Sequence, residues 1–299
     1  MKKIFDCVII GGGIAGLQAA IQLGRYKHEV LVIDREDGRS TLCKSYHNIL
    51  GYPDGVSGEE LRRLGRKQAE DLNVQFSKGT VTLLTKIDNY FTIKTEEDTF
   101  SSKKILIATG VLDHIPPLPE LYPCLGVSVY LCPDCDGYEV KDKKTIVIGN
   151  GNVGANMAIT LLYWTRDIIY INHGGREIDG KLQQELFSNN IPIYSQKIKQ
   201  VLASGSHIRG YELADGQKVE SNHSFIAFGG NKVRSDLAVE LGVDVMDNNH
   251  IIVDPRTKMT KIDGVWAAGD VVAHSEQVTI AMGEGSQAAI WIHKALLKR

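Results

Sequence analysis

A glycine-rich turn near the N-terminus constrains the fold of this chain more than any other feature. The sequence Gly11-Gly12-Gly13-Ile14-Ala15-Gly16 follows an apolar run and precedes a helical stretch that reaches about Tyr26. In that setting Gly11 permits a tight turn, Gly13 lets the backbone approach a pyrophosphate, and Gly16 allows the helix to pack closely on the strand. The backbone N–H groups and the positive dipole end at the start of the helix then face the phosphates. The sequence therefore predicts a dinucleotide site at this turn.

An acidic residue completes this first site. The apolar segment 30–33 predicts a second strand, and Asp34 follows it directly. A carboxylate at this spacing binds the ribose hydroxyls of a dinucleotide. The alternative is a glycine-rich turn that binds no ligand.

The chain repeats this arrangement about halfway along. A strand at 145–148 leads into a second turn with the same spacing, a helix follows, and a further strand lies at 168–171. The second turn carries Gly149, Gly151 and Gly154. Each copy also ends in a similar strand and turn, at 105–110 and 224–230. The pattern predicts an α/β fold with two doubly wound, Rossmann-like nucleotide-binding domains.

Two segments indicate the domain boundaries. Residues 114–123 hold four of the eight prolines, and proline-dense stretches are typical of linkers. A second junction is expected near Asp247. We expect a discontinuous first nucleotide-binding domain formed by residues 1–115 and 247–299, with the second nucleotide-binding domain, residues 116–246, inserted into it.

A segment near the C-terminus favours a flavin at the first site. Residues 264–271 predict a strand that ends at Gly269, with Asp270 at the mouth of a following helix that begins near Gln277. In flavoproteins with two dinucleotide sites this arrangement places a carboxylate on the ribityl chain. The alternative is a surface turn whose aspartate only caps a helix.

A Cys-x-x-Cys motif is the predicted chemical centre. Of the five cysteines, Cys132 and Cys135 are separated by two residues, and Asp136 follows them. This spacing lets both sulfurs meet in one turn, where a thiolate is stabilised, and the carboxylate can move a proton. The alternative is half of a zinc site, but the chain contains no second Cys-x-x-Cys motif to complete it, so no metal is predicted.

Bulk properties exclude several classes of protein. The net charge of −2 argues against a nucleic-acid partner, which requires a basic surface. No apolar run approaches the roughly 20 residues of a membrane helix. The beginning of the chain resembles a secretion signal only faintly, because glycines 11–13 interrupt its apolar stretch. We expect a soluble, cytoplasmic protein.

Taken together and in this order, the motifs resemble those of the low-molecular-weight thioredoxin reductases over essentially the whole chain. The matching segments are 11–16, 48–53, 108–110, 132–137, 268–270 and 277–285. The resemblance implies FAD as prosthetic group, a homodimer, and rotation of the inserted domain between two poses. It implies that Cys135 faces the flavin and that Cys132 attacks the disulfide of a thioredoxin-like protein. The FAD contacts that it implies include Asn48, Gly110, Gly269, Asp270 and Gln277.

The second nucleotide site departs from that family. Members that use NADPH carry a His-Arg-Arg stretch after the strand, whereas this chain reads His173-Gly174-Gly175-Arg176, and the strand is followed by Asn172 instead of an acid. Each charged hydrogen bond to a phosphate contributes roughly 1.5–3 kcal/mol, so we predict weak use of NADPH. The enzyme then uses NADH, receives electrons from a protein donor such as ferredoxin, or runs in reverse as an FAD dithiol oxidase that reduces oxygen. Residues 46–50 and the Cys-Pro-x-Cys-Asp-Gly-Tyr-Glu form are similar to a branch containing such oxidases, which leaves a small dithiol or disulfide as an alternative substrate.

The sequence leaves the roles of two histidines open. His47 and His274 lie near segments that are expected to approach the flavin. Each is either an acid–base group or an ordinary loop histidine.

Overall fold

A computed structural model describes residues 3–273 and 275–298, so His274 lies outside the described residues. The chain divides into two compact units. The first unit comprises Met1–Thr41, Gly58–Leu112 and Lys232–Arg299, and the second comprises Leu42–Ser57 and Asp113–Asn231. Each unit is built on its own mainly parallel sheet, which confirms the predicted fold class.

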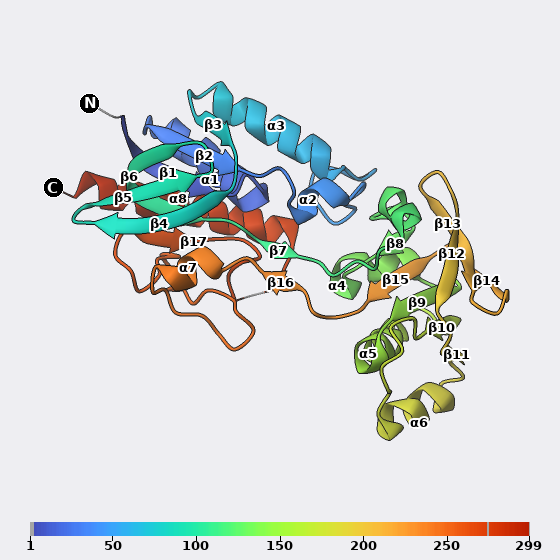
Figure 1. Cartoon of the computed structure of the whole chain (residues 1–299). Coiled ribbons are helices and arrows are strands. Elements are labelled where there is room, and N and C mark those ends of the chain that lie inside the picture. The colour runs from blue at the N-terminus through green and yellow to red at the C-terminus, as the bar shows by residue number, and fades with distance from the viewer. Residues whose placement is uncertain (1–2, 274, 299) are drawn as a thin grey trace. The chain divides into compact units, whose positions relative to one another are not determined.

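The first unit contains a seven-stranded sheet in the order β3-β2-β1-β6-β5-β4, with β17 also paired to β6 (Figure 1). Its strands are β1 (Ile4–Ile10), β2 (Val30–Asp34), β3 (Gln75–Lys78), β4 (Val81–Ile87), β5 (Tyr90–Thr95), β6 (Thr99–Ile107) and β17 (Val265–Ala267). Strands β3, β2, β1, β6 and β17 run parallel to one another, whereas β5 pairs antiparallel with both β6 and β4. The parallel part puts the carboxyl ends of β1, β2, β6 and β17 at one edge, where a doubly wound sheet binds its ligand.

Helices and strands cover both faces of this sheet, because successive strand residues point to opposite sides. Cys7 and Ile9 pack on the side covered by α1 (Ile14–Arg25) and α8 (Val278–Leu297). Val8 and Ile10 point to the other side, where they share a core with buried residues of β4, β5 and α7 (Asp236–Glu240). Helix α3 (Gly58–Glu70) also belongs to this unit, and α2 (Arg39–Leu42) lies at the boundary where the unit ends at Thr41.

The second unit repeats the plan with a five-stranded sheet in the order β11-β10-β9-β15-β8. Its strands are β8 (Val129–Tyr130), β9 (Thr145–Gly149), β10 (Ile168–Ile171), β11 (Ile193–Tyr194) and β15 (Ser224–Ala227). One face packs against α5 (Gly151–Leu161) and α6 (Gly180–Ser188), and the other packs against an antiparallel sheet of β12 (Ile198–Ser204), β13 (His207–Leu213) and β14 (Lys218–Glu220). The proline-rich segment contains the 3₁₀ helix η1 (Pro119–Cys124), and the Cys-x-x-Cys motif forms α4 (Pro133–Asp136) followed by η2 (Gly137–Val140).

The connections between the units lie side by side. Strand β7 (Val111–Leu112) pairs antiparallel with β16 (Lys232–Val233), and Figure 1 shows the two strands together. The first unit therefore resumes at Lys232, earlier than the predicted junction near Asp247. Val233, Ala238 and Val243 are buried in the core of the first unit, and this packing holds the segment there.

A second difference concerns residues 42–57, which group with the second unit although they lie between two segments of the first. The Lys44 N–H donates a hydrogen bond to the Leu125 carbonyl at 2.9 Å, and the side chain of Leu42 packs on the core of the second unit. A linear reading of the chain cannot detect this excursion.

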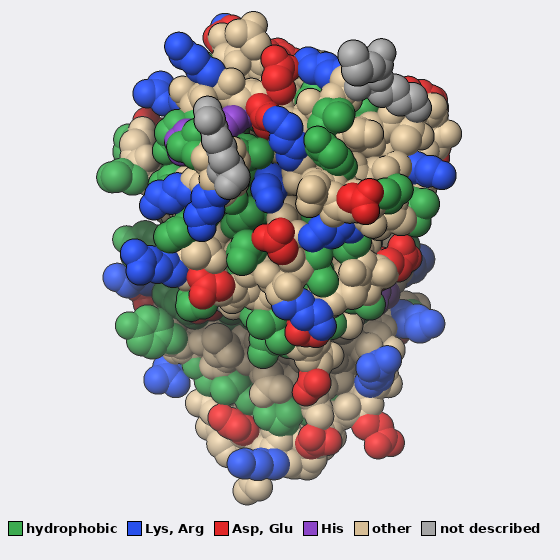
Figure 2. Space-filling view, turned by 90° about the vertical axis from the view of Figure 1, so that its left-hand side faces the viewer, with side chains coloured by type: hydrophobic (Ala, Val, Ile, Leu, Met, Phe, Trp, Pro, Cys, Tyr) green, Lys and Arg blue, Asp and Glu red, His purple; other side chains and the backbone are tan. Residues whose placement is uncertain are grey.

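Among the described residues, no helix is long and apolar enough to cross a bilayer. On the face shown in Figure 2, lysine and arginine side chains are interspersed with aspartate and glutamate.

Candidate functional site

The first glycine-rich turn joins β1 to α1 in the geometry that its sequence predicts. Gly11 has φ +106°, and a Cβ there would lie 2.3 Å from the Ala108 carbonyl oxygen. A Cβ on Gly16 would lie 1.9 Å from the carbonyl oxygen of Gly11. Both positions therefore require glycine. A Cβ on Gly13 would meet no atom within 4 Å, so open space lies over the residue that caps α1. A pyrophosphate fits this cradle.

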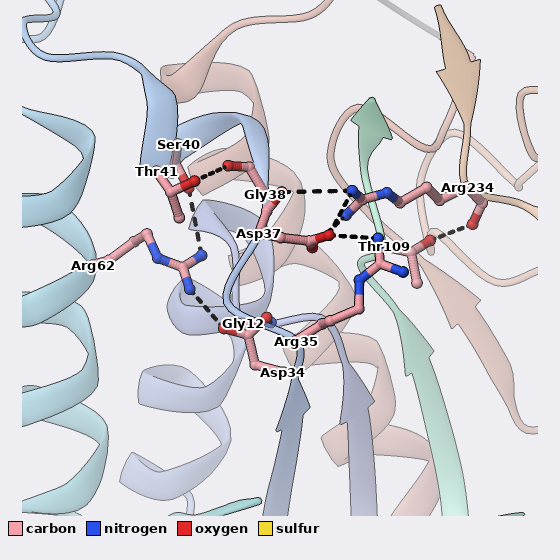
Figure 3. Close-up of polar contacts among 10 residues, drawn as sticks. All are labelled: Gly12, Asp34, Arg35, Asp37, Gly38, Ser40, Thr41, Arg62, Thr109 and Arg234. Carbon is pink, nitrogen blue, oxygen red and sulfur yellow. Dashed lines mark hydrogen bonds and ion pairs between the residues drawn. The ribbon is translucent and has the colours of Figure 1, made fainter. Parts of the chain in front are cut away.

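Asp34 is held at the edge of the turn (Figure 3). Its Oδ1 accepts a hydrogen bond from the Gly12 N–H at 3.0 Å, and its Oδ2 lies 2.6 Å from Nη2 of Arg62. Arg62 comes from α3, and no sequence motif identified it. The arginine orients the carboxylate through this charge-assisted contact.

A second cluster lies beside this one and joins the segments that follow β2, β6 and β16. Arg234 pairs with Asp37 at 2.9 Å, while the Thr109 hydroxyl donates to the Arg234 carbonyl at 2.6 Å (Figure 3). Although burial raises the pKa of Asp37, hydrogen bonds and charge from Arg35 and Arg234 bring it below its usual value. Gly110 follows with φ +67° and open space around it. The predicted FAD contact at Gly110 is therefore sterically possible.

The C-terminal motif lies in the same unit. A Cβ on Gly269 would lie 2.8 Å from the Ala15 side chain, and the Gly269 N–H donates to the buried Glu284 carboxylate at 2.9 Å. Asp270 pairs with Arg39 at 2.8 Å, and Arg39 also pairs with Glu276 at 2.5 Å. Neither Arg39 nor Glu284 was identified from the sequence.

Two other predicted FAD contacts have different locations. Gln277 is the N-cap residue of α8, as the helix prediction required. Asn48 is exposed and belongs to the second unit, so its contact with FAD stays a prediction.

The two cysteines of the motif lie within one helical turn. Cys132 is the N-cap residue of α4, and the Asp136 N–H donates to the Cys132 carbonyl at 3.0 Å. Both side chains are in the thiol form and partly buried. A hydrogen bond with Cys135 lowers the pKa of Cys132, and the same hydrogen bond, together with burial, raises the pKa of Cys135. In the reduced pair, Cys132 is therefore the thiol that ionises first.

Asp136 lies beside these sulfurs. Burial, and secondarily the negative charge of Glu139, raise the pKa of the Asp136 carboxyl to about 7. A carboxyl group with this pKa both accepts and releases protons at neutral pH, which is the requirement for general acid–base catalysis.

The second glycine-rich turn differs from the first. Packing requires glycine at both Gly149 and Gly154. A Cβ on Gly149 would lie 2.5 Å from the Ala227 carbonyl oxygen, and a Cβ on Gly154 would lie 2.4 Å from the Tyr170 ring. However, α5 already begins at Gly151, whereas α1 begins one residue after its counterpart Gly13. A Cβ on Gly151 would lie 2.8 Å from the Glu177 carbonyl oxygen, where the first turn has open space.

The loop after β10 closes on this second turn through hydrogen bonds. The Asn172 Oδ1 accepts from the Gly151 N–H at 2.9 Å, and the Asn150 Oδ1 accepts from the Arg176 N–H at 3.1 Å. The Gly174 N–H donates to the Gly149 carbonyl at 3.0 Å. A Cβ on Gly174 would lie 2.3 Å from the Asn150 side chain, so this loop conformation requires glycine there. The chain's own groups thus occupy the space above the second turn.

The remaining cysteines do not extend the motif into a metal centre. Cys7 and Cys124 are buried, and burial raises the pKa of both thiols. Within residues 3–273 and 275–298, no group of three or more His, Cys, Asp or Glu side chains could hold a metal ion.

Comparison with known proteins agrees with these features. The family model for pyridine nucleotide-disulphide oxidoreductases matches residues 5–285. A thioredoxin reductase of Aquifex aeolicus is 29% identical over 98% of this chain and 94% of its own length. Among solved structures, HlmI is 27% identical with a TM-score of 0.87, covering 99% of this chain and 94% of that one. The thioredoxin reductase of T. acidophilum is 27% identical with a TM-score of 0.62, covering 98% and 99%.

The thioredoxin reductases to which this chain is similar are enzymes that use FAD. An FAD-type cradle in the first unit and a Cys-x-x-Cys pair in the second agree with that chemistry. The chain therefore belongs to the pyridine nucleotide-disulphide oxidoreductase family, as a flavin-dependent enzyme similar to the low-molecular-weight thioredoxin reductases.

Proposed function

We propose that this enzyme exchanges electrons between FAD, the Cys132–Cys135 pair and an external dithiol or disulfide. One observation carries the proposal: two thiols share a hydrogen bond beside Asp136, a carboxyl group whose pKa burial raises to about 7. FAD would be held by the first unit, at Gly11, Gly13, Gly16, Asp34, Gly110, Gly269, Asp270 and Gln277. When bound there, it supplies a carrier that takes up or releases two electrons.

The thiol chemistry follows from the different pKa values of the two cysteines. In the reducing direction, the Cys132 thiolate attacks the external disulfide, forms a mixed disulfide and releases one substrate thiolate. Cys135 then loses its proton to Asp136 and attacks the Cys132 sulfur. This step forms the Cys132–Cys135 disulfide and releases the second substrate thiolate, which Asp136 protonates. The oxidising direction is the same sequence in reverse.

The closed second turn supports the view that the nicotinamide nucleotides are poor electron donors. A dinucleotide bound there would have to displace the 174–177 loop, in which the Arg176 N–H donates to Asn150 Oδ1 and the Glu177 carbonyl lies close to Gly151. No arginine fork stands at Gly174 or Gly175 to repay that cost through a 2′-phosphate. Electrons would then enter through the cysteine pair or from a protein donor.

This observation favours a second candidate function beside disulfide reduction. In an FAD dithiol oxidase, the substrate dithiol reduces the Cys132–Cys135 disulfide, and the electrons pass through FAD to oxygen. The relatives named thioredoxin reductase instead suggest a thioredoxin-like disulfide as the electron acceptor. Both functions use Cys132, Cys135 and Asp136, and they differ in the direction of electron flow.

Anaerobic stopped-flow mixing of the purified holoprotein would test the proposal. We expect dithiothreitol to bleach the flavin absorbance within seconds in the wild type, and neither Cys132→Ser nor Cys135→Ser to respond. Cys124→Ala is the matched control, because this thiol is buried away from the pair, and it should bleach normally. Bleaching by dithiothreitol that survives in Cys135→Ser would contradict the proposed electron path.

Parallel mixing with NADPH and NADH tests the donor. We expect both to bleach the flavin at least 100-fold more slowly than the dithiol, and rapid bleaching by NADPH would overturn the argument from the closed turn. Oxygen consumption with a dithiol then distinguishes the two functions. Rapid uptake that depends on Cys135 indicates the oxidase, and its absence indicates a reductase supplied by a protein donor.

A further inference from the structure

The Cys-x-x-Cys motif is followed, within the second unit, by an acidic residue that the proposed electron path does not use. Glu139 lies on η2, three residues after Asp136, and its side chain is mostly buried with 28% exposure. A partly buried carboxylate close to another carboxyl group disfavours ionisation of its neighbour. Glu139 lies on the helical turn directly after the one that carries Asp136, and its negative charge is, after burial, the second cause that raises the pKa of Asp136.

A histidine from the 42–57 segment pairs with this glutamate. Nδ1 of His47 lies 3.5 Å from Oε1 of Glu139, and Nε2 lies 2.9 Å from the Ser45 hydroxyl. A serine hydroxyl both donates and accepts, so it can bond Nε2 whether the imidazole is neutral or protonated. This hydrogen bond therefore helps to hold the imidazole beside Glu139.

Glycine 55 holds the histidine in this position. It has φ +82°, and a Cβ there would lie 2.4 Å from the Ser45 hydroxyl oxygen and 2.6 Å from Cδ2 of His47. Backbone hydrogen bonds between Tyr46 and Val56 close the same loop. The backbone at Gly55 thus lies directly against the side chains of Ser45 and His47, and Glu139 takes no part in this contact.

The geometry points to His47 and Glu139 as positioning residues that set the proton affinity of Asp136 during thiol–disulfide exchange. The inference rests on the proposed function of the cysteine pair. The negative charge of Glu139 favours the protonated form of Asp136. The imidazole of His47, whose Nδ1 lies 3.5 Å from Oε1 of Glu139, offsets part of that charge, so Asp136 releases its proton more readily than it would without this pair.

Other groups also face Asp136 and have to be held constant in any test. They are Cys132 and Cys135 of the motif, Tyr130 on β8 and Cys43 on the 42–57 segment. Lys143 donates to the backbone carbonyl of Glu139, at 2.7 Å, so its contact remains when the Glu139 side chain is changed. The pair His47–Glu139 can therefore be altered without replacing any of these residues.

The test measures the rate of alkylation of Cys132 by iodoacetamide against pH in the reduced holoprotein. Ionisation of Asp136 makes the nearby thiolate less favourable, so it produces an inflection near neutral pH that Asp136→Asn should abolish. We expect Glu139→Gln to move this inflection down by about one pH unit, because it removes a neighbouring negative charge. His47→Gln should move it in the opposite direction.

The double variant decides whether the histidine acts through the glutamate. If it does, His47→Gln has no further effect in the Glu139→Gln background. Inflections that stay within 0.2 pH units of wild type in both single variants, or an undiminished His47→Gln shift in the double variant, would overturn the inference. Alkylation requires no electron transfer to FAD, so this result is independent of the flavin-bleaching test of the proposed function.

Discussion

At the scale of single residues, Asp136 combines a chemical use with a cost in stability. Burial raises the pKa of its carboxyl from 3.8 to about 7, so the folded chain binds a proton there more tightly than the unfolded chain does. Stability from this group is fully present below about pH 4 and is lost as the pH rises towards 7.

We predict that Asp136→Asn removes this loss. Between pH 5 and pH 8, the free energy of unfolding of the variant should rise by roughly 2 kcal/mol relative to that of the wild type, because an amide has no charge to desolvate. Thermal unfolding at the two pH values would measure the difference. Asp134→Asn is the matched control, since Asp134 is exposed on the same helix and should follow the wild type at both pH values. An equal pH dependence in Asp136→Asn and wild type would contradict the prediction.

Arg62 provides a second prediction at this scale. Its guanidinium group lies 2.6 Å from the Asp34 carboxylate, which we propose as the ribose acceptor for FAD. Arg62→Ala should weaken FAD retention by about tenfold, because the carboxylate loses a charge-assisted hydrogen bond of roughly 1.5–3 kcal/mol that orients it. Fluorescence of released FAD against protein concentration would measure the affinity. Arg63→Ala is the control, since Arg63 pairs with Glu60 on the exposed side of the same helix, and equal FAD retention in the two variants would refute the role of Arg62.

At the scale of elements, α1 and α8 pack closely enough to require glycine at the contact. A Cβ on Gly285 would lie 2.2 Å from the Ala15 carbonyl oxygen, whereas a Cβ on Gly283 in the same helix would meet nothing within 4 Å. Gly285→Ala should therefore push the helices apart and destabilise the first unit by more than about 2 kcal/mol. Gly283→Ala should stabilise it by about 0.5–1 kcal/mol, since alanine favours a helix. Thermal denaturation of both variants tests the pair, and similar unfolding temperatures would show that the contact is looser than described.

The loop that closes the second turn makes a further prediction possible. Gly174→Arg inserts a Cβ 2.3 Å from the Asn150 side chain, so the single variant should lose stability without gaining an NADPH site. Asn150→Gly removes that clash, and the double variant should recover most of the lost stability. Melting temperatures and flavin bleaching by NADPH would follow both effects. Rapid bleaching by NADPH in Gly174→Arg alone would show that the loop opens freely.

At the scale of the whole molecule, each unit has cores on both faces of its own sheet. Such units unfold as separate cooperative blocks when few contacts are shared. We predict two unfolding transitions in calorimetry. Removal of FAD should lower the temperature of only the transition that belongs to the first unit, because ligand binding stabilises the state that binds it. A single transition that shifts as a whole would contradict this division.

Much of the fold and the centre of the candidate site could be predicted from the sequence, because they depend on neighbouring residues. Gly11 and Gly16 are required by backbone contacts within one strand–turn–helix unit and its neighbouring strand. Cys132, Cys135 and Asp136 share a single helical turn, so their proximity follows from spacing alone. The repeated strand–turn–helix pattern then implied two similar sheets, as observed.

Only the tertiary structure decided the rest, because the contacts join residues that are distant in sequence. It brought Arg62 to Asp34 and His47 to Glu139, and it assigned residues 42–57 and 232–246 to units that local composition did not indicate. The sequence by itself determined that a second nucleotide turn exists and lacks its arginines. Tertiary packing determined that this turn is filled, since the hydrogen bonds of Asn150 and Asn172 depend on where the chain returns after β10.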